Sequence, residues 1–251
     1  MFDTFYNLFS IAFINLLLRL KYDIIYFMSK AIAIIVQARL NSQRCKNKML
    51  RQFDDSSLFE LQLNKLNQLS KNTNYSVYCA VGEGPFFKIL NNYEFVKTIK
   101  RNKKSVTSDA IGDVFNYLNN VNEDTVCFVN ACAPLLNIST LKKAIDLYYE
   151  IGLKSLTTVV EKKTWYFDNN NKPINDNSSG NTKDLSPLYE CTHNFHIFKK
   201  NFFLDNKKYW GNKVNDPYLF VVDFLESLDI DTEKEFNYVE KIYKSLKNFT
   251  L

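Results

Sequence analysis

Glycine is scarce in this sequence: only six occur among 251 residues, and no segment matches the pattern G-x-x-x-x-G-K-[ST]. That pattern forms the glycine-rich loop with which one large class of nucleotide-binding proteins surrounds phosphate groups. Its absence excludes a P-loop nucleotide site. Any phosphate-binding loop in this chain must therefore depend on other backbone N–H groups and on arginine and lysine side chains.

Cysteine and histidine are also few, and their spacing argues against two kinds of site. The five cysteines show neither a C-x-x-C pair nor the spacing of a zinc site; they are Cys45, Cys79, Cys127, Cys132 and Cys191. An odd and scattered set is typical of a reducing compartment, which predicts a cytoplasmic location. The two histidines, His193 and His196, lie far along the chain from Cys132, so no pattern supports Cys132 as a nucleophile.

No strong charge of one sign dominates the chain, whose formal net charge is +5. The lysines are spread along the sequence and form no basic tail, so nucleic-acid binding is not indicated, whereas a small anionic substrate fits. Hydrophobic residues make up 46% and charged residues 24% of the chain. This is the composition of an ordinary globular protein, long enough for one substantial α/β domain.

A long uninterrupted apolar run is missing as well. The most apolar stretch, residues 5–20, is interrupted by Asn7, Asn15 and Arg19, which makes it too short and too polar to predict a transmembrane span. Neither a basic start nor a small-residue cleavage site indicates a signal peptide. Three interpretations of residues 1–28 stay open: a membrane-surface helix, a helix packed on the domain or a partner, and translation from too early a start. We favour the last and expect the domain to occupy residues 29–251.

The chain changes character abruptly between Ala31 and Leu50. Ala31 to Val36 is a short apolar run, the pattern of a strand buried on both faces of a parallel sheet. Residues 37–48 hold hardly an apolar side chain and are predicted as a loop at the carboxyl end of that strand, where ligands bind in open α/β sheets. Arg39, Arg44 and Lys48 could meet phosphate charge there. Taken as charge alone, a solvated basic turn is the more common explanation.

Strand patterns alternate with helical patterns through the rest of the chain. Strands are predicted at 75–81, 95–99, 125–129, 155–160 and 188–198, and helices at 57–70, 86–92, 108–118, from Ser139 onward and at 233–246. This alternation predicts an α/β fold. Residues 160–175 are predicted to form a projecting hairpin arm with its tip at 168–171, and residues 176–184 a flexible loop.

Two aspartates precede the last predicted helix. Asp229 and Asp231 are two residues apart, so in an extended chain they project to the same side, which suits a magnesium ion held by one or two carboxylates. Helix capping is the alternative explanation. However, Thr232 and Glu235 already form a T-x-x-E capping box, which leaves Asp231 free for a metal.

The basic loop resembles a known family signature. Residues 38–48, A-R-L-N-S-Q-R-C-K-N-K, resemble the A-R-x-x-S-x-R-x-P-x-K loop of the sugar-acid cytidylyltransferases, which include the CMP-acylneuraminate synthetases and the Kdo cytidylyltransferases. The residues that fall on the motif are Ala38, Arg39, Ser42, Arg44 and Lys48, while Lys46 stands where the family has proline. Residues 130–135 are similar to the family's Q-P-T-S-P-L, with Asn130 in the place of glutamine. Cys132 stands where the Kdo branch has an acidic metal ligand, so the chain resembles the acylneuraminate branch more.

The resemblance implies further roles. Arg101 resembles an arginine that lies near the nucleotide, although an exposed strand-end arginine explains it equally well. Asn194 aligns with the asparagine of N-G-x-x-Y in a strand that approaches the sugar, and His196 shares its face; a satisfied structural histidine is the alternative. The family's paired aspartates correspond to Asp229 and Asp231 and bind the catalytic metal. The arm is expected to join two copies into a homodimer.

The resemblance predicts a three-layer, Rossmann-like nucleotidyltransferase fold with a mostly parallel sheet. The expected reaction joins CTP and an acidic 2-keto sugar, of the sialic acid-like nonulosonic class, into a CMP-sugar and pyrophosphate. Arg39, Arg44 and Lys48 are expected to hold the triphosphate, with Arg39 and Lys48 acting in catalysis, and Asp229 and Asp231 to hold Mg²⁺. Two other classes stay open: a catalytically weakened homologue that binds nucleotide, and a membrane-surface interaction protein if residues 1–28 are native.

Overall fold

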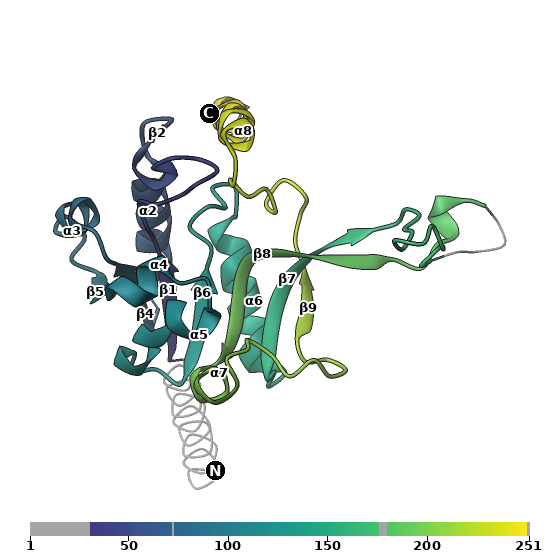
Figure 1. Cartoon of the computed structure of the whole chain (residues 1–251), viewed down its shortest axis with the longest axis horizontal. Coiled ribbons are helices and arrows are strands. Elements are labelled where there is room, and N and C mark those ends of the chain that lie inside the picture. Colours follow the sequence, from purple (N-terminus) through teal and green to yellow (C-terminus); the bar gives the residue numbers. More distant parts are fainter. Residues whose placement is uncertain (1–30, 72, 176–179, 250–251) are drawn as a thin grey trace, which may run out of the picture.

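A seven-stranded sheet forms the centre of the computed structural model, which describes residues 31–71, 73–175 and 180–249. The strands lie in the order β5-β4-β1-β6-β8-β7-β9 (Figure 1). Their bounds are β1 Ile32–Gln37, β4 Tyr75–Val81, β5 Val96–Lys100, β6 Thr125–Val129, β7 Ser155–Lys162, β8 Leu188–Lys199 and β9 Tyr218–Val221. Four of the neighbouring pairs are parallel, and β8 runs antiparallel to both β6 and β7. The predicted mostly parallel sheet is confirmed.

The predictions for residues 1–28, including the boundary of the domain at residue 29, lie outside the described residues, as does part of the loop predicted at 176–184. Among the residues that are described, no helix is both long and apolar enough to cross a lipid bilayer.

Strand β1 contributes side chains to two apolar clusters, one on each face of the sheet. Residues 32–36 are all 0% exposed, and their side chains alternate between the two faces of the sheet. Ile32, Ile34 and Val36 join one apolar cluster, whereas Ala33 and Ile35 join the other. Because both of its faces are buried, β1 lies in the middle of the sheet. The loop that follows β1 is therefore at the centre of the sheet's carboxyl edge.

Helices cover both faces and make the fold three-layered (Figure 1). The larger cluster contains side chains of α2 (Leu58–Ser70), α3 (Gly84–Leu90), α6 (Ile138–Glu150) and α8 (Glu233–Phe249). The smaller one contains side chains of the short helix η2 (Asn116–Asn120) and of α7 (Lys200–Asn206). The remaining short elements are η1 (Lys48–Leu50), β2 (Gln52–Phe53), β3 (Ser56–Ser57), α4 (Lys103–Thr107), α5 (Ile111–Val114) and η3 (Thr182–Asp184).

Capping boxes fix the starts of two covering helices. Ser57 Oγ accepts a hydrogen bond from the N–H of Glu60, whose carboxylate accepts one from the N–H of Ser57. At α8, Thr232 and Glu235 make the same reciprocal pair, as predicted. The N–H of Asp231 also donates to the Glu235 carboxylate, but the Asp231 side chain takes no part in this cap.

The prediction of one helix over residues 108–118 is wrong. The helix α4 ends at Thr107, and Ser108 turns the chain by accepting a hydrogen bond from the N–H of Ala110. The chain then forms α5 and η2 separately. A serine hydroxyl that binds nearby backbone competes with helix formation, and Gly112 lowers helix propensity further.

Strands β7 and β8 continue beyond the sheet as a two-stranded arm that projects from the domain (Figure 1). The turn predicted at 168–171 is present, because Asp168 Oδ1 accepts hydrogen bonds from the N–H groups of Asn170 and Lys172. The hairpin predicted over 162–173 is reduced to a single bridge between Phe167 and Pro173. The long pairing partner of β7 is β8, which sequence alternation alone could not reveal.

Candidate active site

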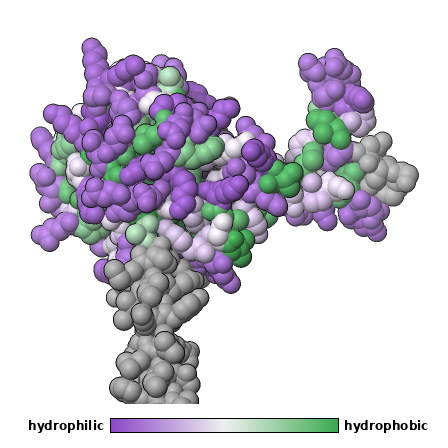
Figure 2. Space-filling view, turned by 90° about the horizontal axis from the view of Figure 1, so that it is seen from below, coloured by the Kyte–Doolittle hydropathy of each residue, from purple (hydrophilic) through white to green (hydrophobic). Residues whose placement is uncertain are grey.

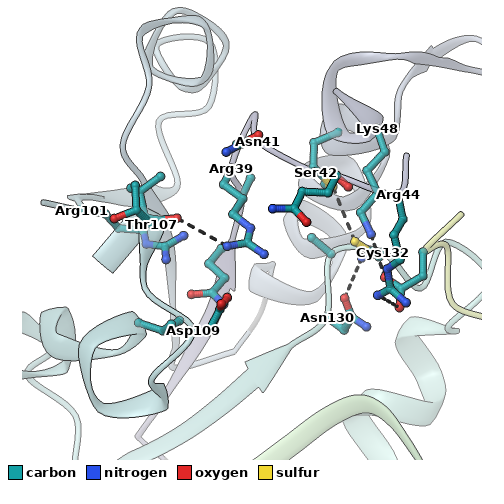
Figure 3. Close-up of a pocket in the computed structure, with 18 of the residues that line it drawn as sticks. Arg39, Asn41, Ser42, Arg44, Lys48, Arg101, Thr107, Asp109, Asn130 and Cys132 are labelled. Atoms are coloured by element: carbon teal, nitrogen blue, oxygen red, sulfur yellow. Dashed lines mark hydrogen bonds and ion pairs between the residues drawn. The ribbon is translucent and has the colours of Figure 1, made fainter. Parts of the chain in front are cut away.

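A cavity of about 570 Å³ lies at the carboxyl edge of the sheet. Its walls come from the loop after β1, from residues 106–109 at the end of α4 and just beyond it, from the segment after β6 and from Asp231 before α8. In Figure 3, Lys48, Arg44 and Cys132 lie at one end of the cavity and Arg101, Thr107 and Asp109 at the other. Segments far apart in the sequence thus enclose one elongated polar space.

The loop after β1 is fastened to the neighbouring strand β4. The N–H of Ala38 donates to the carbonyl of Ala80 over 3.2 Å, and the N–H of Leu40 donates to Glu83 Oε1 over 3.0 Å. Ala38 is buried, whereas Ser42 is half-buried and lines the cavity. These two hydrogen bonds anchor the start of the loop at the cavity, although Arg39, Arg44 and Lys46 are exposed.

Asp231 joins the two cations at one end of the cavity. Arg44 Nη2 lies 2.6 Å from Asp231 Oδ2, and Lys48 Nζ lies 3.2 Å from Asp231 Oδ1 and also donates to the carbonyl of Ile230. Burial opposes the charge on Lys48, but Cys132 and Asp231 beside it raise its pKa, so the ammonium group is charged at neutral pH. The basic loop and the terminal aspartate, predicted separately, meet here.

Two further arginines lie along the cavity. Arg39 is exposed, and its Nη1 lies 3.5 Å from the carbonyl of Val106 on the opposite wall. Arg101 is only 4% exposed, with Nε donating to Ser105 Oγ over 2.9 Å and Nη2 donating to the carbonyl of Ser105. Burial, followed by the charge of Arg39, lowers the pKa of Arg101. Arg101 is thus a fixed wall residue and not an exposed strand-end arginine.

The segment after β6 forms the floor beside Lys48. The Asn130 N–H donates to the carbonyl of Asn194 over 2.8 Å, and Asn130 Oδ1 accepts from the N–H of Cys132 over 2.9 Å. Burial raises the pKa of Cys132 to about 11. Its thiol is protonated at neutral pH, and a thiol is a weaker nucleophile than a thiolate.

Asp229 differs from Asp231 in having an unsatisfied oxygen. Its Oδ1 is buried and has no hydrogen-bond partner, and burial together with the Asp231 charge raises its pKa. A buried carboxylate oxygen without a donor fits a hard cation. No group of three acidic, histidine or cysteine side chains within the described ranges is arranged to hold a metal. The protein would thus supply at most two carboxylates, which is how Mg²⁺ is commonly held beside phosphates.

Asn194 and His196 are buried in β8 and do not line the cavity. Asn194 Nδ2 donates to the carbonyl of Glu226 over 2.7 Å. His196 Nδ1 lies 2.8 Å from Thr157 Oγ1, and its ring stacks on Tyr209. Burial, and then His193, lowers the pKa of His196 to about 3, so the ring is neutral. Their placement matches the structural alternative for the histidine, and their contact with a sugar stays a prediction.

Sequence reasoning missed part of the wall. Thr107, Ser108 and Asp109 line the cavity opposite the basic loop, as does Gln37 at the end of β1. The sequence pattern places Ser108 and Asp109 at the start of a helix over 108–118, which hides their position at the cavity. A turn-forming serine followed by Gly112 was the available signal.

Comparison with known proteins gives this arrangement its family. A family model described as cytidylyltransferase matches residues 33–250, and the chain belongs to that family. The predicted recognition of a cytidylyltransferase is thereby confirmed at the level of the family.

One curated protein matches about half of the chain. The chain is 27% identical over 128 residues to the post-translational flagellin modification protein B of Campylobacter coli, and the match covers 48% of this chain and 53% of that protein. The chain thus spans about half the length of this curated relative.

Two solved structures share the fold at low identity. One is the 4-diphosphocytidyl-2C-methyl-D-erythritol synthase of Anaerococcus prevotii, with a TM-score of 0.63, 13% identity, and coverage of 87% of this chain and 98% of that one. The other is CMP:2-keto-3-deoxy-manno-octonic acid synthetase complexed with CTP, with a TM-score of 0.63, 11% identity, and coverage of 86% and 99%. These matches confirm a nucleotidyltransferase fold.

Proposed function

We propose that this cytidylyltransferase activates an acidic 2-keto sugar, of the sialic acid-like nonulosonic class, with CTP to give the CMP-sugar and pyrophosphate. The observation that carries the proposal is the cluster of Arg44, Lys48 and Asp231, which places two cations and a carboxylate at one end of the cavity. The name of the CMP:2-keto-3-deoxy-manno-octonic acid synthetase supports a sugar acid, and a CMP-sugar product implies a role in glycan biosynthesis.

The chemistry needs positioning and charge more than covalent catalysis. The anomeric hydroxyl of the sugar attacks the α-phosphorus of CTP in line, a new P–O bond forms, and the bond to pyrophosphate breaks. Arg39, Arg44 and Lys48 hold the triphosphate, and Lys48 gains interaction as negative charge grows on the leaving group. Ala38, Ser42, Arg101 and Asn130 complete the proposed nucleotide site. Asn194, whose carbonyl accepts from the N–H of Asn130, and His196 are the proposed sugar-binding residues.

Asp229 and Asp231 would hold Mg²⁺ in this proposal. The ion would supply a positive charge that polarises the α-phosphate. The unpartnered Oδ1 of Asp229 supports this assignment, because a buried acceptor needs a donor or a cation. Asp231 now accepts from both Arg44 and Lys48, so it must share or exchange these partners when the ion binds.

We further propose a cytoplasmic homodimer joined through the arm. All five cysteines are free thiols, which supports a reducing compartment. The arm carries large apolar side chains in solvent: Phe167 is 58% and Ile174 59% exposed. Figure 2 shows the arm standing away from the domain with hydrophobic residues along it. Replacing Phe167 and Ile174 with Asp should reduce the mass measured by light scattering from that of two chains to that of one, and an unchanged mass would exclude the arm.

A thermal-shift screen of the four nucleoside triphosphates tests the nucleotide. CTP at 100 times its dissociation constant should stabilise the chain by about 2.7 kcal/mol, or roughly 5–10 °C for a domain of this size, and the other three should do less. Pyrophosphate release with CTP and a panel of acidic 2-keto sugars then tests the reaction. Binding of CTP without turnover on any sugar would favour the catalytically weakened homologue. Phe195 and Phe198 argue for that alternative, because they are buried where the family's N-G-x-x-Y motif has glycine and tyrosine.

A further inference from the structure

Outside the cavity, four side chains of β7 and β8 form one connected polar cluster. Cys191 Sγ lies 3.8 Å from His193 Nδ1 and 3.4 Å from Thr157 Oγ1. His193 Nδ1 lies 3.1 Å from His196 Nε2, and His196 Nδ1 lies 2.8 Å from Thr157 Oγ1. The proposed reaction does not use Cys191 or His193. A thiol beside an imidazole is the arrangement that activates sulfur nucleophiles.

The cluster depends on an unusual backbone. The pairing of β7 with β8 is shifted between Thr157 and Val159, and His193 has a φ of 55°, in the left-handed region. This conformation departs from the regular alternation of the strand and brings the exposed His193 ring near both Cys191 and the buried His196. Non-glycine residues seldom adopt a positive φ, and such positions concentrate at functional sites.

The two imidazoles have different protonation. His196 is buried and neutral, with its Nδ1 at Thr157, so its Nε2 can accept a hydrogen bond from the Nδ1–H of His193. The hydrogen bond with Cys191 raises the pKa of His193 against the effect of burial, and the Cys191 and Asp229 charges add to it. The groups that face His193 are thus Cys191, His196 and, through its charge, Asp229.

Cys191 is the reactive candidate among the five thiols. Cys45, Cys79 and Cys127 are 0% exposed, and burial raises the pKa of each. Cys132 lines the cavity with its pKa raised to about 11. Cys191 is half-buried, and although burial opposes its ionisation, the hydrogen bonds with His193 and Thr157 outweigh burial and lower its pKa.

We propose that Cys191 is a modification site for hydroperoxides and other soft electrophiles, with His193 as its acid–base partner. In the reaction with hydrogen peroxide, the thiolate attacks one peroxide oxygen, the S–O bond forms and the O–O bond breaks. Sulfur is oxidised to sulfenic acid, and the departing hydroxide takes the proton of the His193 imidazolium to leave water. The proposal is independent of the sugar substrate, because modification is measured on the protein itself.

Peptide mass spectrometry of the native full chain tests this. The chain is exposed to limiting hydrogen peroxide with dimedone as a trap for sulfenic acid. Cys191 should be labelled at least about 10-fold faster than any other cysteine, because the thiolate is the reacting form. Replacing His193 with Asn, which tolerates a positive φ, should remove most of this advantage, while Cys132→Ser, the matched control, should leave it unchanged. Equal labelling of Cys132 and Cys191, or an unchanged rate in His193→Asn, would overturn the proposal.

A second measurement needs no variant and therefore no assumption about folding. Iodoacetamide alkylation of the native wild type is followed at Cys191 between pH 8.5 and pH 6.5. An ordinary thiol with a pKa of about 8.5 loses about 50-fold in rate over this range, because its thiolate fraction falls by that factor. Cys191 should lose clearly less. A full loss at Cys191, equal to that of the same residue in the urea-unfolded chain, would show that the cluster does not activate the thiol.

Discussion

The exchange of Asp231 for Asn separates a metal-binding role from a structural one. Asp231 lies between Arg44 and Lys48, and its side chain is 40% exposed. Asparagine keeps the size of the side chain and one oxygen that can still accept from Lys48. The change therefore removes a negative charge and little else from this end of the cavity.

The cost to folding should be small. The Arg44 side chain is 67% exposed, and exposed ion pairs contribute about 0–1 kcal/mol. Lys48 is 12% exposed and retains its hydrogen bond to the carbonyl of Ile230, and Thr232 still caps α8. We expect a loss of about 1 kcal/mol, which lowers the melting temperature by roughly 2–4 °C in a domain of this size.

The effect on the reaction should be much larger. If two carboxylates hold the cation, the exchange removes half of the negative charge that the protein supplies to it. The rate with CTP and sugar should then fall by about 100-fold, which corresponds to a rise of about 2.7 kcal/mol in the activation free energy. The Mg²⁺ concentration for half-maximal rate should rise. Asp229→Asn should behave alike, since its buried Oδ1 lacks any other partner.

A magnesium titration beside a melting curve measures both effects. Glu233→Gln is the matched control, because Glu233 lies two residues from Asp231 but pairs with Arg51 and does not line the cavity. Normal magnesium dependence in both aspartate variants, with a lowered melting temperature, would mean that the aspartates only hold the basic loop in place. The assignment of the metal site would then be wrong.

Two further predictions concern Lys48 and His196. Lys48→Ala should lower turnover more than it weakens CTP binding, because Lys48 is proposed to meet the negative charge that develops on pyrophosphate. Lys46→Ala serves as the control, since Lys46 does not line the cavity. A raised KM with unchanged turnover in Lys48→Ala would contradict the role. The pKa of His196 is lowered to about 3, below its ordinary 6.5, so the unfolded chain binds more protons and stability falls as the pH falls from 6.5 toward 3. Urea unfolding at pH 5 and pH 7 should show a smaller pH effect in His196→Gln than in the wild type, and equal effects would refute the buried neutral ring.

The sequence predicted the elements whose pattern is repeated or continuous. The strand at 125–129 has the predicted bounds, and the helix at 57–70 begins one residue later with Ser57 as its cap. Both are long or uniform enough for the apolar period to decide the type of element. The irregular stretch after Ser108 has no such period, because its buried side chains, Phe115, Tyr117 and Leu118, lie in η2 and at its junction with α5.

Burial was harder to predict than secondary structure. Alternation along β8 suggested that Asn194 and His196 share a face, but it could not show that β8 lies between β6 and β7. An interior strand can be covered on both faces, so polar side chains there meet other protein groups. The tertiary pairing that buries them arises from an antiparallel insertion in a parallel sheet, which leaves no local signal.

The meeting of the basic loop with Asp231 has a consequence for the proposed reaction. Without nucleotide, the carboxylate of Asp231 neutralises the cations that are proposed to hold the triphosphate. In the proposed reaction, the phosphates would pair with Arg44 and Lys48, and Asp231 would be released to hold Mg²⁺. The charges would then be matched both before and after binding, so neither an unpaired cation cluster nor an unpaired carboxylate would have to be stabilised. The proposal thus gives a physical reason why the cation motif and Asp231 meet in the fold, although more than 180 residues separate them in the sequence.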